Sequence, residues 1–522
     1  MKIIQLLLLL GFLFFNSLVF SQHENIMIVN VDGPNEPTIA IDPNNTNRLI
    51  GGSNLNFYFY SDDGGYTWQY GVLTSASLGV WGDPVTMVDN NGHYYFFHLS
   101  NPPSGNWIDR IVCQKSTDGG VTWNEGTYMG LNGTKAQDKH WVIIDRNNGN
   151  IYVTWTQFDS YGSSNPSHRS NIMFSKSTDG GMTWSPALRI NEVDGDCIDS
   201  DNTVEGSVPA VGPNGEIYAS WSGPSGLVFD KSLDQGETWL ENDIFISDLP
   251  GGWDIAIPGI YRANGFPVTV CDLSGGPNHG TIYINWSDQR NGEDDTDVWL
   301  IKSTDGGETW SERKRVNNDP PGNQQFFTWM TIDQVTGYLH VVFYDRRNYT
   351  DNQTDVYMAV SKDGGNTFFN YKVSEEPFIP NSWIFFGDYN NVTAHDNVIR
   401  PVWTRMHDGQ RSIMTAIIDS QILSVENAQT PVIPFALEQN YPNPFYGSTG
   451  FSFRLKRAST ISLKIFDLFG REVATLVDDE YRFPGNYTVH FDSRAYQLSP
   501  GVYYFSLSGN EVNQVRKMII ER

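Results

Sequence analysis

One eight-residue pattern, Ser-x-Asp-x-Gly-x-Thr-Trp, recurs six times along the chain and restricts its fold more than any other feature. The copies begin at Ser61, Ser116, Ser177, Ser232, Ser303 and Ser361. Successive copies start 55, 61, 55, 71 and 58 residues apart. A spacing of this size indicates one supersecondary unit per repeat, as in the blades of a propeller.

Each copy is expected to form a tight turn between two strands. The Ser and Asp side chains can accept hydrogen bonds from backbone N–H groups, and the glycine adopts a backbone angle that other residues resist. The closing tryptophan then buries a large apolar face. Two copies depart from the pattern, because Gln235 replaces a glycine in the fourth copy and Phe368 replaces the tryptophan in the sixth.

The repeat resembles the Asp-box, or bacterial neuraminidase repeat, of sialidases and other propeller proteins. The resemblance implies an all-β fold, an Asp-box β-propeller. In that family the Asp-boxes are structural and lie away from the active site. The box residues are therefore expected to support folding rather than chemistry.

The segments between the boxes predict about four short strands in each repeat and no helix. Seven first strands start near Pro37, Pro84, Trp141, Val208, Pro267, Thr328 and Tyr389. Only six of these repeats carry a box, and the last one lacks a strand. We expect Asn25–Val31 to supply that strand and close the ring, which removes a free sheet edge. Seven blades are therefore favoured over six.

A different domain follows a linker-like segment at 421–434. Residues 435–522 alternate in polarity and predict a small antiparallel β-sandwich. The stretches from Phe435, Ile461 and Leu498, and the final Lys517–Ile520, resemble the C-terminal sorting domain of the type IX secretion system of Bacteroidetes. The resemblance implies recognition by that machinery and delivery to the medium or the outer-membrane surface of a Gram-negative bacterium. An ordinary carbohydrate-binding sandwich is the alternative.

The N-terminus has the pattern of a secretory signal over residues 1–21. Lys2 precedes a nearly continuous apolar run from Ile3 to Leu18, and small residues suit cleavage before Gln22. A membrane anchor is the alternative reading, and no later segment is long and apolar enough to span a bilayer. The propeller is then expected over residues 22–420.

The composition excludes some partners. The formal net charge is −26, and nearly all of it lies outside the C-terminal domain. Such a field repels nucleic acid and anionic membranes, so neither is expected to bind. Three cysteines, Cys113, Cys197 and Cys271, do not indicate a disulfide framework, and no Cys/His spacing suggests a zinc site.

Acidic residues precede the innermost strands, at the face where propellers of this kind meet their ligands. They are Glu36, Asp83, Asp138, Glu205 and Asp388, at offsets that differ by one or two residues. The last four are candidate catalytic acids, and Glu36 is a candidate ligand-binding residue. A ring of carboxylates would attract a cation or a cationic ligand. The alternative is that these acids cap turns.

The sialidase resemblance also implies three arginines that clamp the substrate carboxylate, a tyrosine nucleophile with a partner glutamate, and an aspartate acid/base. The first of those arginines belongs to a Phe/Tyr-Arg-Ile-Pro motif. Here that place reads Asn35-Glu-Pro-Thr38, with no arginine. This departure argues against sialidase activity. Tyr389 is a conceivable nucleophile, as are Tyr261 and Tyr344, but nothing in the sequence marks them out.

Four arginines follow the second strands of later repeats and are candidates for ligand binding: Arg290, Arg346, Arg347 and Arg405. Two of these arginines recur in one internal pattern, with Asp297 and Asp355 following at like distance. Such repetition favours a structural Arg–Asp pair over a unique catalytic group.

One loop packs four acids into eight residues: Asp194, Asp196, Asp199 and Asp201. Carboxylates at that density suit Ca²⁺. A solvated acidic loop is the alternative, and the spacing does not match the EF-hand pattern. No other cofactor is indicated.

The sequence thus predicts an exported Asp-box propeller with two candidate functions. The first is a module that binds a glycan or a surface protein and has no sialidase activity. The second is a glycoside hydrolase, either exo-sialidase-like or with two acids, such as Asp83 and Asp388, on opposite walls. Whether the protein is an enzyme stays open at this point.

Overall fold

The computed structural model describes residues 23–419, 435–455, 459–468, 470–483, 485–509 and 512–521. The predicted signal at 1–21 and the predicted linker at 421–434 lie outside these residues. The chain divides into two compact units, Met1–Ser424 and Val425–Arg522. The described residues form strands and loops without a helix, so the search for a membrane-spanning helix finds no candidate among them.

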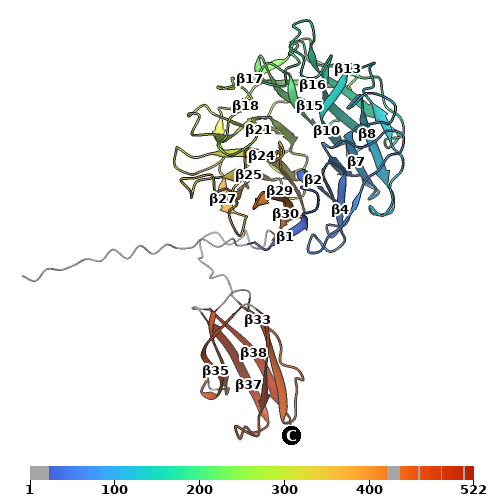
Figure 1. Cartoon of the computed structure of the whole chain (residues 1–522). Coiled ribbons are helices and arrows are strands. Elements are labelled where there is room, and N and C mark those ends of the chain that lie inside the picture. Colours follow the sequence, from blue (N-terminus) through green and yellow to red (C-terminus); the bar gives the residue numbers. More distant parts are fainter. Residues whose placement is uncertain are drawn as a thin grey trace, which may run out of the picture. The chain divides into compact units, whose positions relative to one another are not determined.

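Seven antiparallel sheets, arranged around one axis, make up the described part of the first unit (Figure 1). In the first four blades the strands follow in chain order from the axis outward. They are β2 (Asn35–Ile41), β3 (Leu49–Asn54), β4 (Phe57–Ser61) and β5 (Gln69–Val72); β6 (Val85–Val88), β7 (Tyr94–Leu99), β8 (Ile111–Ser116) and β9 (Thr127–Met129); β10 (Ala136–Ile144), β11 (Ile151–Phe158), β12 (Ser170–Ser177) and β13 (Leu188–Arg189); β14 (Glu205–Val211), β15 (Ile217–Gly223), β16 (Gly226–Ser232) and β17 (Ile244–Ser247).

The fifth and sixth blades have the same order. They are β20 (Val268–Cys271), β21 (Ile282–Asp288), β22 (Asp297–Ser303) and β23 (Lys314–Arg315); β24 (Gln325–Asp333), β25 (Tyr338–Asp345), β26 (Asp355–Ser361) and β27 (Phe369–Lys372). A small hairpin of β18 (Asp254–Ile255) and β19 (Ala263–Asn264) precedes the fifth blade.

The seventh blade closes the ring with a strand from the start of the chain. It contains β28 (Asn391–His395), β29 (Val398–His407), β30 (Gln410–Ala416) and the short β31 (Ile418–Asp419). Its outer strand is β1 (Asn25–Val29), which pairs antiparallel with β30 and sets Asn25 opposite Ala416. The prediction of seven blades closed by the N-terminal segment is confirmed.

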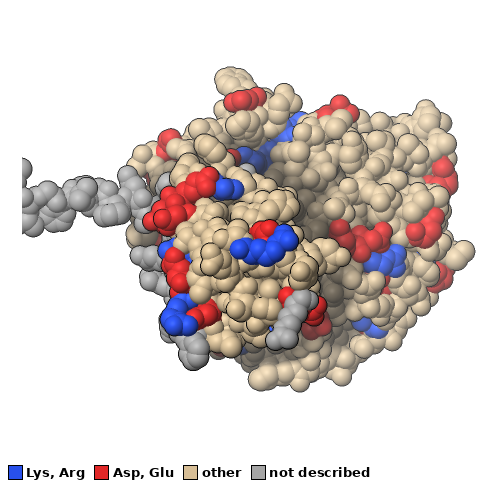
Figure 2. All heavy atoms as spheres, turned by 90° about the horizontal axis from the view of Figure 1, so that it is seen from below, with Lys and Arg blue, Asp and Glu red and all other residues tan. Residues whose placement is uncertain are grey.

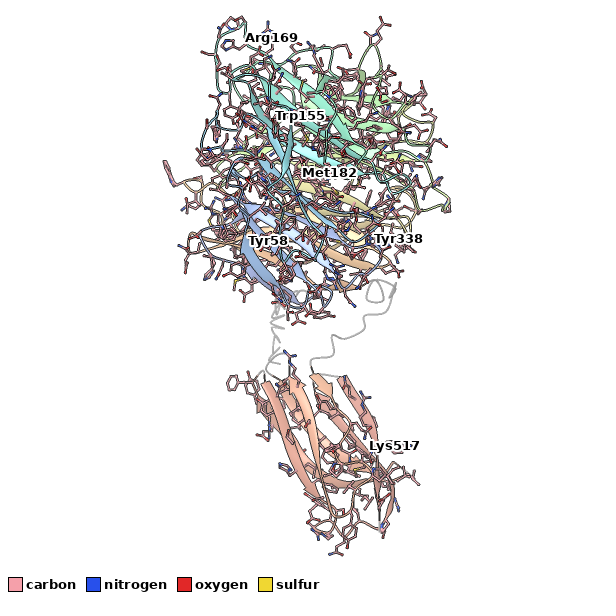
Figure 3. The ribbon with its side chains drawn as sticks, turned by 90° about the vertical axis from the view of Figure 1, so that its right-hand side faces the viewer. Tyr58, Trp155, Arg169, Met182, Tyr338 and Lys517 are labelled. Carbon is pink, nitrogen blue, oxygen red and sulfur yellow. The ribbon has the colours of Figure 1, made fainter. Side chains whose placement is uncertain are left out.

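The seven inner strands surround a central channel. Each of β2, β6, β10, β14, β20, β24 and β28 contacts the next, and β28 contacts β2. They line a mainly apolar cavity of ≈ 480 Å³. The second strands of four blades each bury a tryptophan completely: Trp155, Trp221, Trp286 and Trp403. Figure 3 labels Trp155 inside the body of the propeller.

The Asp-boxes form the turns that the sequence predicts. In the first copy, Asp63 Oδ1 accepts hydrogen bonds from Ser61 Oγ at 2.8 Å and from the Thr67 amide at 2.9 Å. Ser61 Oγ in turn accepts from the Gly65 amide at 2.9 Å. The same bonds recur in the other boxes. In the second box, hydrogen bonds from Thr122 lower the pKa of Asp118 to about 2.

Five of the six boxes also accept a hydrogen bond from a basic side chain of the neighbouring blade. Lys231, directly before the fourth box, reaches into the fifth blade, where its Nζ is 2.8 Å from the carbonyl oxygen of Gly306. Equivalent contacts to the next box run from Lys115, Lys176 and Lys302. Arg400 of the seventh blade completes the series, with Nε 2.6 Å from Gly64 O in the first box. These five contacts are called the inter-blade links below.

The box tryptophans pack against the preceding blade. Trp239 meets Phe174 with ring centroids 5.2 Å apart, and Trp310 meets Phe229 at 5.0 Å. Trp123 and Trp184 make the corresponding contacts. The boxes therefore form contacts between neighbouring blades as well as turns within each blade.

The second unit is a β-sandwich, as predicted. One sheet orders β32 (Phe435–Leu437), β33 (Ser448–Leu455) and β36 (Gly485–Asp492), and the other β35 (Glu472–Arg482), β34 (Ser459–Phe466), β37 (Gly501–Gly509) and β38 (Val512–Ile520). Phe451 and Phe505 connect the two sheets, with ring centroids 4.5 Å apart. Lys517, labelled in Figure 3, lies on β38.

Charge on the surface is spread rather than gathered. Figure 2 shows acidic side chains in small groups over one face, interspersed with basic ones and with much uncharged surface.

We expect Arg400→Met to destabilise the propeller by about 3 kcal/mol or more, because it leaves buried carbonyl oxygens of Gly64, Ile399 and Ile418 without their charged donor. Urea unfolding followed by tryptophan fluorescence measures the change. Arg405→Met on the same strand is the control. Its partner Glu376 is exposed, so a loss below about 1 kcal/mol is expected. Equal losses would show that the link to the first box contributes little.

Candidate functional site

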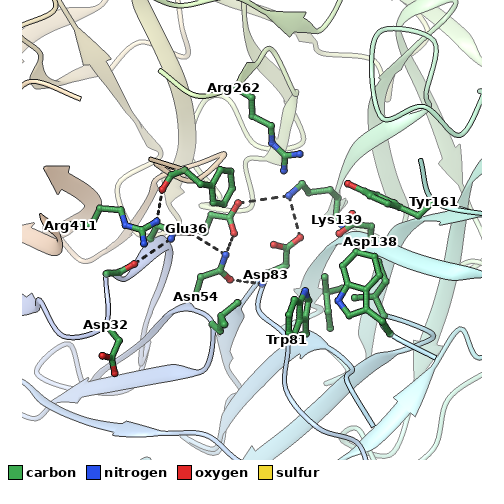
Figure 4. Close-up of a pocket in the computed structure, with 17 residues that line it drawn as sticks. Asp32, Glu36, Asn54, Trp81, Asp83, Asp138, Lys139, Tyr161, Arg262 and Arg411 are labelled. Carbon is green, nitrogen blue, oxygen red and sulfur yellow. Dashed lines mark hydrogen bonds and ion pairs between the residues drawn. The ribbon is translucent and has the colours of Figure 1, made fainter. Parts of the chain in front are cut away.

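A polar cavity of ≈ 450 Å³ lies where the inner strands begin, at the entrance to the channel. Figure 4 shows the side chains that line it. They come from the starts of β2, β6 and β10, from loops of the second, third, fifth and seventh blades, and from β30. This cavity is called the mouth below.

A bulge at the start of the inner strands sets the direction of the site residues. The register of β2 against β3 shifts between Asn35 and Thr38, and β10, β14 and β24 shift at the same place. The residue at this place in the chain adopts a left-handed backbone in six blades, with φ of 51° at Glu36, 50° at Asp83 and 47° at Lys139. For residues other than glycine this conformation costs free energy, and such strained residues are often found at functional sites.

The bulge explains why the predicted acids stand at different offsets. Glu36 and Asp83 are the left-handed residues of the first and second blades. Asp138 and Glu205 lie one residue earlier, and Asp388 follows the left-handed glycine of the seventh blade. Glu36, Asp83 and Asp138 line the mouth, whereas Asp388 accepts a hydrogen bond from Lys139 and Glu205 is buried near Asp138 and Asp199 without lining the cavity.

Lys139 occupies the centre of the acids. Its Nζ is 2.7 Å from Asp388 Oδ2, 3.3 Å from Asp83 Oδ2 and 3.8 Å from Glu36 Oε1. Burial opposes its charge, but these carboxylates raise the pKa of Lys139 well above its ordinary value. The ring was expected to attract a cation or a cationic ligand, and in the structure the Lys139 side chain already places a positive charge among these carboxylates.

Arg262 holds the far side of the same network. Its Nε donates to Asp388 Oδ1 at 2.8 Å, its Nη2 donates to Asp388 Oδ2, and its Nη1 is 3.2 Å from Asp199 Oδ2. Asp388 is buried, yet Lys139 and Arg262 together hold its pKa well below the ordinary range. Asp388 is therefore ionised and fully paired.

Three of the other four acids, Glu36, Asp138 and Glu205, favour their protonated forms. Burial and the Asp83 carboxylate raise the pKa of Glu36 and of Asp138 well above their ordinary values. Burial and Asp199 do the same for Glu205, whose side chain is fully buried. Asp83 differs, because Lys139 outweighs the cost of burial and lowers its pKa. One site thus holds carboxyl groups with pKa values pushed apart, which is typical of functional sites.

The acids together with Lys139 and Arg262 are called the floor of the mouth below. An aromatic wall borders this floor on one side. Trp81 and Trp107 are 37% and 44% exposed, and their rings meet edge to face with centroids 6.0 Å apart. Tyr161 continues the wall at 5.6 Å from Trp107, and its hydroxyl donates to Asp199 Oδ2 at 2.6 Å. Trp81 and Tyr161 lie on one side of the Asp83–Lys139 pair in Figure 4, and Arg411 on the other.

Arg411 is the third basic residue of the mouth. Its Nη1 donates to the carbonyl oxygen of Phe385, and among the described residues it makes no ion pair. Burial lowers its pKa. Lys139, Arg262, Arg411 and both tryptophans of the wall were missed by sequence reasoning. Only Lys139 and Trp81 had a signal, since they stand in the segments that carry Asp138 and Asp83.

Four arginines predicted to bind a ligand do not line the mouth: Arg290, Arg346, Arg347 and Arg405. Arg290 Nε is 2.9 Å from Asp288 Oδ1 at the end of β21, and Arg347 makes the corresponding pair in the next blade. The expected Arg–Asp pairs therefore exist, but not with Asp297 or Asp355. Those aspartates begin the third strands and pair with other basic residues.

The candidate tyrosines are placed unfavourably for nucleophilic attack. Tyr389 is buried below the mouth and packs on Trp141, with ring centroids 4.9 Å apart. Burial and Asp83 raise its pKa well above the ordinary value, which opposes ionisation. Tyr344 is buried and donates to a backbone carbonyl, and Tyr261 is exposed outside the lining of the mouth.

The loop predicted to bind calcium does not gather its four acids: Asp194, Asp196, Asp199 and Asp201. Asp194 pairs with Arg189, whereas Asp199 faces Tyr161 and Arg262 in the mouth. The other two accept hydrogen bonds from protein donors. Across the residues that the structure describes, no group of three His, Cys, Asp or Glu side chains could hold a metal ion. The calcium prediction finds no ligand set here, because successive side chains of the loop turn to different partners.

Glu205→Gln tests the protonation of the site, because glutamine keeps the shape of the protonated acid. A folded-state pKa above the unfolded value of about 4.3 stabilises the fold at low pH, and that contribution is lost as the pH rises through the folded pKa. As the pH rises through the raised folded pKa of Glu205, the melting temperature of the unmodified protein should therefore fall relative to that of the variant. Calorimetry at several pH values measures it.

Asp388→Asn is the matched variant, because folding lowers the pKa of Asp388 whereas it raises that of Glu205. Its pKa is lowered in the fold, so its contribution is present above the unfolded pKa of about 3.9 and is lost as the pH falls through the folded pKa. At neutral pH this variant leaves Lys139 and Arg262 short of a carboxylate, and a loss of about 3–5 kcal/mol is expected. Identical pH profiles for the two variants would contradict the assignment.

Two family models match the chain. The secretion system C-terminal sorting domain covers residues 439–521, and the BNR/Asp-box repeat covers residues 59–70. A sialidase of Bacteroides fragilis is 24% identical over 279 residues, which are 49% of this chain and 48% of that protein. The chain thus spans about half the length of this curated relative.

Solved structures of similar proteins include a Hadza microbial sialidase, with 15% identity and a TM-score of 0.41 over 72% of this chain and 74% of that one. The NanB sialidase of Streptococcus pneumoniae has 10% identity and a TM-score of 0.42, over 71% and 83%. An α-L-arabinofuranosidase of Fusarium graminearum has 12% identity and a TM-score of 0.42, over 77% and 99%.

The sorting domain marks the chain for export through the type IX secretion system, to the cell surface or the medium. The Asp-box match and the seven-bladed topology identify the first unit as an Asp-box propeller. The protein is a sialidase-like Asp-box β-propeller that carries a C-terminal sorting domain.

Proposed function

We propose that the mouth of the propeller binds a glycan and that the protein acts as an exported binding module without sialidase activity. The observation that carries this proposal is the aromatic wall beside a floor whose charges already satisfy one another. Trp81 and Trp107 offer apolar ring faces, and the floor offers polar groups. A sugar ring has apolar C–H faces and a polar edge, so it matches both surfaces.

The basic groups of the mouth do not favour a sialidase clamp. Such a clamp needs arginines free to take a carboxylate in bidentate fashion. Arg262 already holds Asp388 and Asp199, and Lys139 is enclosed by acids. Arg411 alone among these three has no carboxylate partner in the described residues. The absence of an arginine at Asn35–Thr38 agrees with this view.

We expect Trp107→Ala to weaken glycan binding about tenfold, because truncating a central aromatic anchor costs more than about 1 kcal/mol. A glycan array followed by titration calorimetry on the best ligand measures it. Trp383→Ala is the control, since Trp383 is 90% exposed and does not line the mouth. Silence of the unmodified protein on glycan arrays would overturn the proposal, and binding to a protein array alone would replace the glycan with a protein ligand.

A glycoside hydrolase is the second candidate. It is favoured by the neighbouring Asp138 and Asp83, since one favours the protonated form and the other is ionised. Hydrolases of this kind use one carboxylic acid as a proton donor and one carboxylate. The pair Asp83 and Asp388 fits less well, because Lys139 binds both and neither keeps a proton to donate.

Fluorogenic glycosides, sialosides among them, test this second candidate. Hydrolysis is expected to fall by about a hundredfold or more in Asp138→Asn if Asp138 is the general acid. Trp383→Ala again serves as the control. No turnover of any substrate by the unmodified protein would exclude the hydrolase and leave the binding module.

A further inference from the structure

We infer that the mouth binds two adjoining residues of a glycan chain, one against each of two separate aromatic walls. This inference rests on the proposed function and adds the class of ligand to it. The ligand is an oligosaccharide, or a stretch of a longer chain, rather than a single sugar.

The first wall is the one already described. Trp81 comes from the loop between β5 and β6, and Trp107 from the loop between β7 and β8. Their edge-to-face contact and the contact of Trp107 with Tyr161 fix the ring directions. The wall is thus rigid, and its exposed faces border the cavity.

The second wall is the ring of Phe385. Arg411, which donates to the Phe385 carbonyl oxygen, lies across the Asp83–Lys139 pair from Trp81 in Figure 4. Phe385, whose carbonyl oxygen accepts from Arg411, lines the mouth and meets Tyr261 edge to face at 6.0 Å between centroids. Tyr261 is 59% exposed. The Arg262 guanidinium packs on one face of the Phe385 ring, 5.3 Å from its centroid.

The floor between the walls is polar and nearly neutral. Asp83 and Asp388 are ionised, and Lys139 and Arg262 balance them. Glu36 and Asp138 favour their protonated forms and add no full charge. A floor of this kind can exchange hydrogen bonds with sugar hydroxyl groups without demanding a charged ligand.

The volume of the mouth agrees with a ligand of this size. Pockets of about 300–1,000 Å³ hold drug-sized molecules, and ≈ 450 Å³ lies in that range. Trp81 and Arg411, which bonds Phe385, lie on opposite sides of the Asp83–Lys139 pair (Figure 4), so one sugar ring stacked on the first wall is not expected to reach Phe385. Two linked rings can reach it, and the bond between them then lies over the floor.

A ladder of oligosaccharides tests the inference with the full-length protein. The probes are gluco-, xylo-, galacto- and N-acetylglucosamine oligosaccharides of one, two and four residues, measured by titration calorimetry. Affinity is expected to rise about tenfold or more from one residue to two in the series that binds, because the second wall is engaged only then. The gain from two to four should be smaller.

Variants separate the two walls. Phe385→Ala should bring the affinity for the two-residue probe down to that for one residue and leave the single sugar unaffected. Trp107→Ala should weaken both probes about equally. If Phe385→Ala fails to fold, Phe385→Leu replaces it, because leucine removes the ring and keeps an apolar side chain; the same direction and a smaller effect are expected. Trp383→Ala should change neither affinity.

Two results would overturn the inference, and they differ from the failure of the proposed function. Equal affinity for one and two residues, with Trp107→Ala still harmful, would leave a single-sugar site. If Phe385→Ala lowers the affinity for the one-residue and two-residue probes by the same factor, the second wall does not contact the second sugar specifically. Absence of binding to every probe and to the glycan array would remove the proposed function itself.

Discussion

The propeller depends on the inter-blade links. A single four-stranded sheet cannot bury both of its faces, so each blade is stable only through its neighbours. In four blades the lysine before the box serine crosses to the next box, and Arg400 makes the corresponding contact across the seam of the ring. The box tryptophans fill the space between the same pairs of blades. The Asp-box thus matters to the fold because its backbone accepts a partner from the adjacent sheet.

The positions of the side chains in the mouth are set by the inner strands of the same ring. The bulge that begins the inner strands turns Glu36, Asp83 and Lys139 toward the axis, at the cost of a left-handed backbone. Acids from blades far apart in the chain then share one space, and the ions are stable only because Lys139 and Arg262 enter it too. The floor is therefore one network, in which removing any charged member alters the pKa values of the others.

Much of the fold could be predicted from the sequence, because period and alternation are local signals. The spacing of Ser61 and its counterparts gave the blades, and the missing strand of the last repeat pointed to Asn25. The site was predictable only in part. The acids were found, but Lys139 bonds Asp388 across 249 positions, and Arg262 stands in no motif. Calcium was expected from acid density, which does not say that neighbouring side chains turn apart.

The seam of the ring joins the two ends of the propeller within one sheet, since Asn25 pairs with Ala416. Contacts between such distant residues form late, because the entropy of closing a long loop must be met first. Until β1 pairs with β30, the edge of β30 has no partner strand and the ring is not closed. The stability of the whole ring therefore depends on the few residues of β1, because their loss would leave the edge of β30 unpaired.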